Sequence, residues 1–132
     1  MSVAFTVRFS SDDAVHGIAL GSGSPLRFDK MALNTGNGYD SETGIFTAPV
    51  AGTYAFFLTQ MGVDARGTVA LAIVKHGDVL DLVYSKDHED QGSGQVTAHL
   101  GSGQQVWVRH VSGNAVRGSW YTVFTGYLIH AE

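Results

Sequence analysis

The sequence consists of short apolar segments separated by glycine-rich turns, and no segment has the length of a continuous helix. Glycine occurs seventeen times and proline twice, which is typical of a chain built from strands and turns. The longest apolar run, 68–83, is interrupted by Gly77-Asp78. Its first half, 69–74, is short, continuous and partly β-branched, which favours a buried strand over a helix. We therefore predict an all-β fold.

Alternation of apolar and polar residues places the individual strands. In the segment from Val3 to Phe9 every second residue is large and apolar, so one face is expected to be buried. Comparable segments recur about every 8–12 residues, which is typical of a β-sandwich or closed barrel. We expect strands at 3–9, 26–33, 43–49, 52–63, 69–75, 79–85, 95–100, 105–111 and 120–130, with 86–94 as an acidic loop.

Two of the expected strands are apolar on both faces. The segment 69–74 contains no polar residue, and in 52–63 Ala55 and Phe57 lie opposite a face of larger apolar residues. One face of each strand can pack against a second sheet, and the opposite face needs either a loop or a neighbouring subunit to cover it. A neighbouring subunit is the natural cover in a domain of this size, so we expect the chain to self-associate.

Charge and cysteine content exclude several classes of protein. The net charge is −4 and the three lysines are scattered, so there is no basic patch for nucleic acid. No apolar run reaches the ~18 residues of a membrane span, so membrane insertion is not expected. The absence of cysteine excludes a disulfide scaffold. We interpret 1–132 as one domain with its core at 3–131, and Met1-Ser2 as a cloning remnant after removal of any native signal.

Signatures of catalysis are missing from the sequence. It has no nucleophile elbow, phosphate-binding loop, dinucleotide fingerprint or zinc-protease motif. The six histidines form no ligand pair at i, i+2 or i, i+4. Because no nucleophile and base can be paired, we expect no enzyme activity and no catalytic residue.

Two stretches carry side chains suited to a binding site. The acidic run from Asp87 to Asp90 offers hard oxygen ligands for Ca²⁺, with a solvated loop as the competing interpretation. The stretch 107–121 contains two arginines and two tryptophans. Within it, Trp120 could stack on a sugar ring or instead pack at a strand start or a subunit contact. Trp107 is expected in the core.

Several separated motifs, in order, match one family. They are VAFTVRFS (3–10), RFDKMALNTGNGYDSETGIFTAPVAGTYAFFLT (27–59), DQGSGQ (90–95), LGSGQQVWV (100–108) and FTGYLI (124–129). Through these motifs the chain resembles the globular-head domain of complement C1q over essentially its whole length. Asp40 is expected to bond local backbone N–H groups and Gly44 to take a strained φ, so most signature residues hold the fold.

The resemblance implies a ten-stranded jelly-roll β-sandwich, similar in fold to tumour necrosis factor ligands, that is secreted and forms a homotrimer. The chain is most similar to the short, collagen-less members that invertebrates, notably bivalves, use in innate immunity. We therefore expect a secreted, extracellular, lectin-like pattern-recognition protein that binds microbial carbohydrate or lipopolysaccharide through surface loops. The alternatives are a signalling or adhesion ligand for a protein receptor at inter-subunit grooves, and a calcium-binding matrix component.

The resemblance also implies a calcium site near the trimer axis, from which the chain departs. Asp90 keeps one family carboxylate, but Ser85 stands where the other is expected, which leaves Asp87 as a substitute. Gln104 replaces a further family aspartate. We expect no required cofactor, with Ca²⁺ on Asp87 and Asp90 as the open alternative. The candidate ligand-binding residues are Arg66, His88, Arg109, Arg117 and Trp120.

Overall fold

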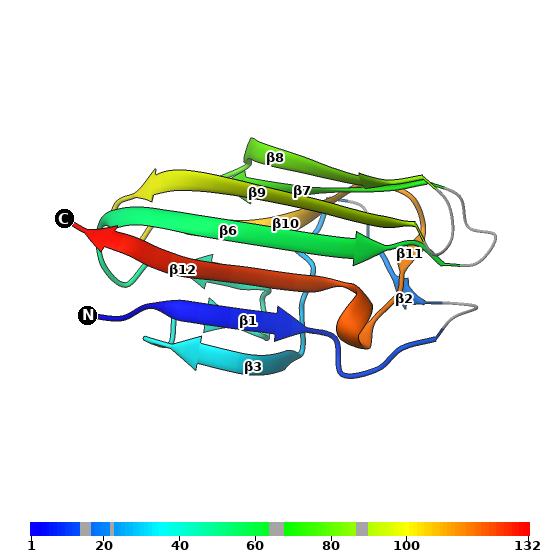
Figure 1. The fold of residues 1–132 in the computed structure, drawn as a ribbon, viewed down its shortest axis with the longest axis horizontal. Helices are drawn as coiled ribbons and strands as arrows, with labels where there is room; N and C mark the ends of the chain where they lie inside the picture. Colours follow the sequence, from blue (N-terminus) through cyan, green and yellow to red (C-terminus); the bar gives the residue numbers. More distant parts are fainter. Residues whose placement is uncertain (14–16, 22, 64–67, 87–89) are drawn as a thin grey trace.

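The computed structural model describes residues 1–13, 17–21, 23–63, 68–86 and 90–132, and two antiparallel five-stranded sheets pack face to face in it (Figure 1). Sheet 1 has the order β3-β1-β12-β6-β9, with β1 (Ala4–Arg8), β3 (Lys30–Thr35), β6 (Gly52–Met61), β9 (Gln91–Leu100) and β12 (Val123–Ala131). Sheet 2 has the order β4-β5-β10-β7-β8, with β4 (Tyr39–Asp40), β5 (Ile45–Thr47), β7 (Val69–Lys75), β8 (Asp78–Ser85) and β10 (Gln105–Ser112). The predicted ten-stranded jelly roll is confirmed.

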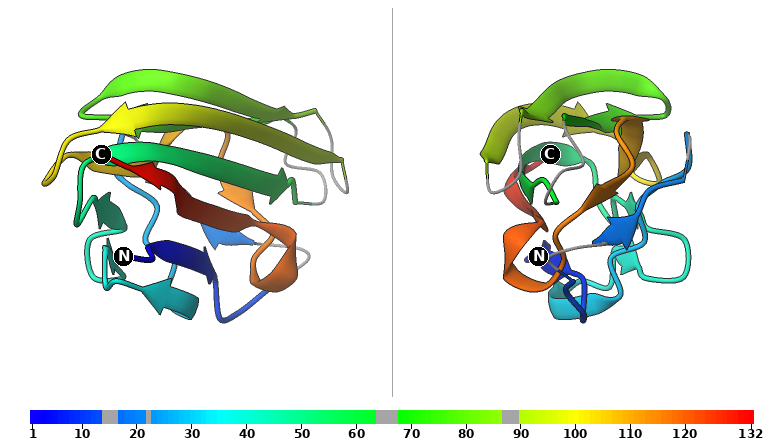
Figure 2. Two further views of the ribbon diagram at one scale, coloured as in Figure 1. Left: turned by 60° about the vertical axis from the view of Figure 1, so that its left-hand side comes forward. Right: turned by 90° about the vertical axis from the view of Figure 1, so that its right-hand side faces the viewer.

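The two ends of the sandwich differ in what they carry. Both chain termini lie at one end, which we call the terminal end (Figure 1). The opposite, distal end carries a small ribbon of β2 (Ile18–Ala19) and β11 (Ala115–Val116), together with the 3-10 turn η1 (Ser119–Tyr121) (Figures 1 and 2). No helix in the described part of the chain is long and apolar enough to cross a membrane.

The core between the sheets is largely aromatic. Phe5 of β1 stacks on Phe46 with ring centroids 4.9 Å apart, and it meets Phe124 edge-on at 5.0 Å. All three side chains are 1% exposed or less. Gly126 leaves room for this packing, since a Cβ at that position would lie 2.5 Å from the Phe5 ring. Large rings of this kind bury 150–250 Å² each, and they hold the two sheets together.

The family signature turn is built as the sequence predicted. Asp40 Oδ1 accepts a hydrogen bond from the Glu42 N–H at 2.9 Å, and Gly44 has a φ of +79°. A side chain at Gly44 would also place its Cβ 2.3 Å from the Leu26 carbonyl oxygen. Glycine is therefore required both by the left-handed backbone and by the close approach of a neighbouring segment.

Three strand boundaries differ from the prediction by three or more residues. β9 begins at Gln91, opposite Met61, so the acidic loop is shorter than the expected 86–94. β3 begins only at Lys30, because the preceding segment is used elsewhere: the Leu26 N–H donates to the Val108 carbonyl at 2.8 Å. The last strand begins at Val123, because the residues before it form the turn η1.

The expectation that β7 needs a neighbouring subunit is wrong. Its outward residues Ala70, Ala72 and Val74 are at most 5% exposed within a single chain. In the strand register Val74 lies opposite Trp107, which is half-buried on the outer side of sheet 2 and is not in the core as expected. The small β7 side chains are covered by larger neighbours on β8 and β10, which a local pattern cannot show.

Candidate recognition site

The structure brings together some of the predicted ligand-binding residues. Arg117 and Trp120 lie next to each other at the distal end, directly before and within η1. Asp90 is at the same end, directly before the start of β9. Arg109 lies in the middle of β10, opposite Ala72 on sheet 2, and is not part of this group. Arg66, Asp87 and His88 lie outside the described residues.

Arg117 is held in an ion pair with Asp12. Its Nε lies 2.9 Å and its Nη2 2.6 Å from the two Asp12 carboxylate oxygens, and Asp12 Oδ1 also accepts the Gly118 N–H at 2.8 Å. The hydrogen bonds from Arg117 hold the pKa of Asp12 below its usual value, and the same contact raises the pKa of Arg117. The guanidinium also lies over the Tyr121 ring, 4.2 Å from its centroid. These contacts of Arg117 therefore fix the turn.

Trp120 is presented outward on this fixed turn. Its side chain is 71% exposed, the largest exposed aromatic among the described residues. The preceding Ser119 has a φ of +49°, a conformation that non-glycine residues rarely adopt, and its N–H donates to the Ser11 carbonyl at 3.0 Å. Strained backbone that holds an exposed indole is typical of a functional site.

Arg8 is a member of the site that the sequence did not identify. The outward side chain of this β1 residue reaches Trp120, and its Cζ lies 3.7 Å from the indole centroid. Its Nε is buried and has no hydrogen-bond partner among the residues that the structure describes. The alternation in 3–9 already placed Arg8 on the outer face, but Trp120 is too distant in sequence for the contact to be predicted.

Asp90 has a structural contact of its own. Its Oδ2 accepts a hydrogen bond from the Lys86 N–H at 2.8 Å, which ties together the two ends of the acidic loop. Within the described ranges, no three side chains of metal-binding type come together. Because Asp87 lies outside those ranges, the calcium site on Asp87 and Asp90 stays a prediction.

The outer face of sheet 1 carries an uncharged surface next to this site. Two cross-strand rows, which we call the sheet 1 face, follow from the register: Gln95, Phe57, Thr125, Thr6 and Leu33, and Thr97, Ala55, Tyr127, Ala4 and Thr35. The rings of Phe57 and Tyr127 stack with centroids 6.0 Å apart, and Tyr127 remains 42% exposed. Ten adjacent positions without a charge are typical of a surface that contacts another protein chain.

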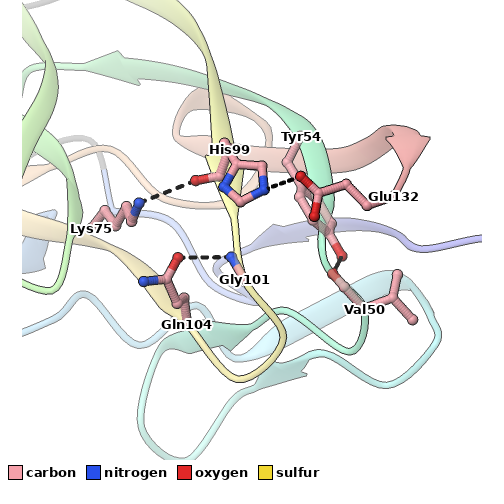
Figure 3. Close-up of polar contacts among 7 residues, drawn as sticks. All are labelled: Val50, Tyr54, Lys75, His99, Gly101, Gln104 and Glu132. Atoms are coloured by element: carbon pink, nitrogen blue, oxygen red, sulfur yellow. Dashed lines mark hydrogen bonds and ion pairs between the residues drawn. The ribbon is translucent and has the colours of Figure 1, made fainter.

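The terminal end of the same sheet is closed by polar contacts (Figure 3). His99 Nε2 lies 2.5 Å from Glu132 Oε1, which joins β9 to the C-terminus, and Lys75 Nζ donates to the His99 carbonyl at 3.1 Å. Gln104 Oε1 accepts the Gly101 N–H at 2.7 Å. The residue that replaces a family aspartate therefore caps the turn between β9 and β10.

Comparison with known proteins identifies a single family. The model of the C1q domain family matches residues 4–129. The human complement C1q and tumor necrosis factor-related protein 9A is 34% identical over 120 residues, which cover 84% of this chain and 35% of that protein. The mouse complement C1q and tumor necrosis factor-related protein 9 is 35% identical over 118 residues, covering 83% and 34%. The chain thus spans about a third of the length of these relatives.

Solved structures agree on the fold. The globular domain of zebrafish complement 1qA superposes with a TM-score of 0.79 at 20% identity, covering 98% of this chain and 99% of that one. The Eiger tumour necrosis factor of S. frugiperda superposes with a TM-score of 0.77 at 11% identity, covering 100% and 94%. At such identities the likeness concerns the backbone arrangement alone.

Proposed function

The chain belongs to the C1q domain family, and from this we propose that it is a secreted homotrimeric recognition protein that binds microbial carbohydrate or lipopolysaccharide at its distal end. The observation that carries the proposal is the rigid outward presentation of Trp120, 71% exposed, at the end of the sandwich away from both termini. A chain joined through its terminal end to further segments keeps this end free.

Self-association is supported by the sheet 1 face. Phe57, Tyr127 and Leu33 belong to its uncharged rows, and Leu33 is 47% exposed in the single chain. Burial of apolar area yields about 25 cal/mol per Å², so removing this face from water is a strong driving force. Three copies would also align three distal ends, and linked weak sites gain effective concentration without any new contact.

Assembly is tested by the mass in solution. We expect sedimentation equilibrium at micromolar concentration to give three times the mass of the chain. Phe57→Asp places a charge in the middle of the sheet 1 face and should give monomers. Val111→Asp is the matched control, because Val111 is an exposed apolar residue, 44% exposed, on sheet 2. A stable wild-type monomer would contradict the assembly.

Carbohydrate binding is tested separately. The wild-type protein is applied to an array of microbial glycans and lipopolysaccharides, beside Trp120→Ala and the control Tyr84→Ala, which removes another exposed aromatic ring, 56% exposed, from sheet 2. We expect binding that Trp120→Ala abolishes and Tyr84→Ala leaves unchanged. An intact trimer that binds no microbial ligand would overturn the carbohydrate proposal.

A second candidate function is a ligand for a protein receptor, and an apolar strip on β8 favours it. Val79, Leu82 and Tyr84 are 53%, 54% and 56% exposed on the edge strand of sheet 2. This edge lies beside β9, the edge of sheet 1, and would flank a groove between neighbouring copies. A receptor complex that buries about 1,600 Å² over this strip, and is lost in Leu82→Asp, would support this function.

A further inference from the structure

We propose that Arg8, Lys30 and Trp120 form a binding site for an anionic saccharide, that is, a sugar ring bearing a carboxylate, sulfate or phosphate group. The inference rests on the proposed recognition of carbohydrate at the distal end and narrows it to one chemical class. Of the three residues, only Trp120 was identified from the sequence.

Arg8 and Lys30 form a pair of positive charges without an acid among the described residues. Arg8 and Lys30 lie directly opposite each other in the β1–β3 ladder, and like charges in such positions repel. Across the described part of the chain, neither side chain makes an ion pair or a hydrogen bond, and Arg8 Nε is buried without an acceptor. A buried donor without a partner carries an uncompensated cost of desolvation, and an anion bound to the same guanidinium would pair its charge.

The acids closest in sequence are already engaged. Asp29, next to Lys30, accepts hydrogen bonds from the Ser10 N–H at 2.9 Å and from the Ser10 hydroxyl. Asp12 holds Arg117 with both of its oxygens. Among the described residues, the acids next to this pair are therefore not available to it, and the positive charge of Arg8 and Lys30 can be met by a group that comes from outside the chain.

The stacking of Arg8 on Trp120 has a geometry suited to an anionic sugar. A guanidinium that lies over an indole keeps its N–H donors in its own plane, where they can meet a planar anion as a fork. The indole face opposite the guanidinium is a flat apolar platform for the C–H face of a sugar ring, on a side chain that is 71% exposed. A neutral sugar would leave the guanidinium unpaired, whereas an anionic sugar satisfies both elements, which gives selectivity as well as affinity.

The site is already held in its binding geometry. The turn that bears Trp120 is fixed on one side by the Asp12–Arg117 ion pair and on the other by the Ser119 N–H bond to Ser11. Arg8 belongs to a strand paired on both of its sides. Little conformational freedom is lost when a ligand binds to groups held in this way.

The experiment measures binding of matched saccharide pairs to the full-length protein by isothermal titration calorimetry. The pairs are oligogalacturonate against its methyl ester, dextran sulfate against dextran, and mannose 6-phosphate against mannose, which separate carboxylate, sulfate and phosphate as the source of the charge. We expect the protein to bind each anionic form about tenfold or more tightly than its neutral partner. The affinity for the anionic form should fall as the salt concentration is raised.

Three variants locate the site. Arg8→Met keeps the aliphatic stem and removes the guanidinium. It should weaken binding of the anionic saccharide by roughly tenfold to a hundredfold and leave binding of the neutral saccharide unchanged. Lys30→Gln should weaken binding of the anionic saccharide several-fold, and Trp120→Ala should weaken binding of both the anionic and the neutral saccharide. Arg27→Met is the matched control: Arg27 is an exposed arginine away from the ladder position, and its loss changes the net charge equally.

The outcomes separate this inference from the proposed function. Equal binding of neutral and anionic sugars would overturn the inference while the carbohydrate proposal stands. Loss of binding in Arg27→Met as large as in Arg8→Met would also overturn it, because net charge alone would then explain the preference. Dissociation of the trimer in Arg8→Met would assign the anion to an acid of a neighbouring copy and overturn it too. No saccharide binding of any kind would remove both.

Discussion

Two arginines lie over neighbouring aromatic rings of the same short turn, and within the described part of the chain only one of them is paired with an acid. Arg117 lies over Tyr121 and is bonded to Asp12 through two nitrogens, with 12% of its side chain exposed. Arg8 lies over Trp120, and no described residue accepts a hydrogen bond from its Nε. The same pair of residue types therefore serves two purposes. The charge that is satisfied inside the chain builds the turn, and the charge that is not is available to a ligand.

The largest effect is expected from removing the acid of the satisfied pair. Asp12→Ala leaves a mostly buried guanidinium unpaired and the Gly118 N–H without an acceptor. The free energy of unfolding should fall by about 2–3 kcal/mol. Chemical denaturation followed by tryptophan fluorescence measures it. A loss below about 0.5 kcal/mol, the scale of an ordinary surface change, would show that the ion pair does not hold the turn.

The pH dependence of the same pair should have a definite sign. Because the pKa of Asp12 is lowered in the folded protein, the unfolded chain takes up the proton first as the pH falls. The contribution is complete above the unfolded pKa of about 3.9 and is lost as the pH falls through that value toward the folded one. Asp12→Asn should therefore destabilise by about 1–2 kcal/mol at pH 7, and by less at pH 3. A difference that is constant or grows on acidification would contradict this.

The two aromatic rings should differ in their contribution to the free energy of unfolding, in the same direction as the arginines that lie over them. Tyr121 is half-buried against Arg117, whereas Trp120 is 71% exposed. Tyr121→Ala should lower the free energy of unfolding by about 1–2 kcal/mol, and Trp120→Ala by about 0.5 kcal/mol although it removes a larger ring. Thermal unfolding of the two variants compares them. Equal losses would mean that Trp120 supports the fold and is not held for a ligand.

Much of the fold followed from local patterns in the sequence. The alternation in 3–9 placed Val3, Phe5, Val7 and Phe9 in the core, and all four are at most 6% exposed. The interruption of the apolar run at Gly77-Asp78 also placed the turn between β7 and β8, where His76 and Gly77 have positive φ. These features depend on side-chain direction and backbone preference within a few residues, which a sequence displays directly.

The site depends on contacts between distant segments and could be predicted only in part. Arg117 and Trp120 were recognised by residue type, but the sequence could not show that Arg117 is occupied by Asp12, 105 positions away. It could not show that Arg8 reaches Trp120 either. The expectation for β7 failed for the same reason, because Trp107 comes from another strand to lie beside it. Residue type indicates what a side chain can do, and only the packing decides which side chains remain available.

The smallest effect, and the sharpest test of the comparison, is expected from Arg8. Arg8→Met keeps the apolar contact with Trp120 and removes a charge that repels Lys30 across the ladder. The free energy of unfolding should change by less than about 0.5 kcal/mol, and a small gain is the expected direction. Denaturation of Arg8→Met, Arg117→Met and the double variant gives the values for both arginines and their coupling. If Arg8→Met were as destabilising as Arg117→Met, both arginines would be structural. Arg8 would then not be available to bind a ligand at the distal end.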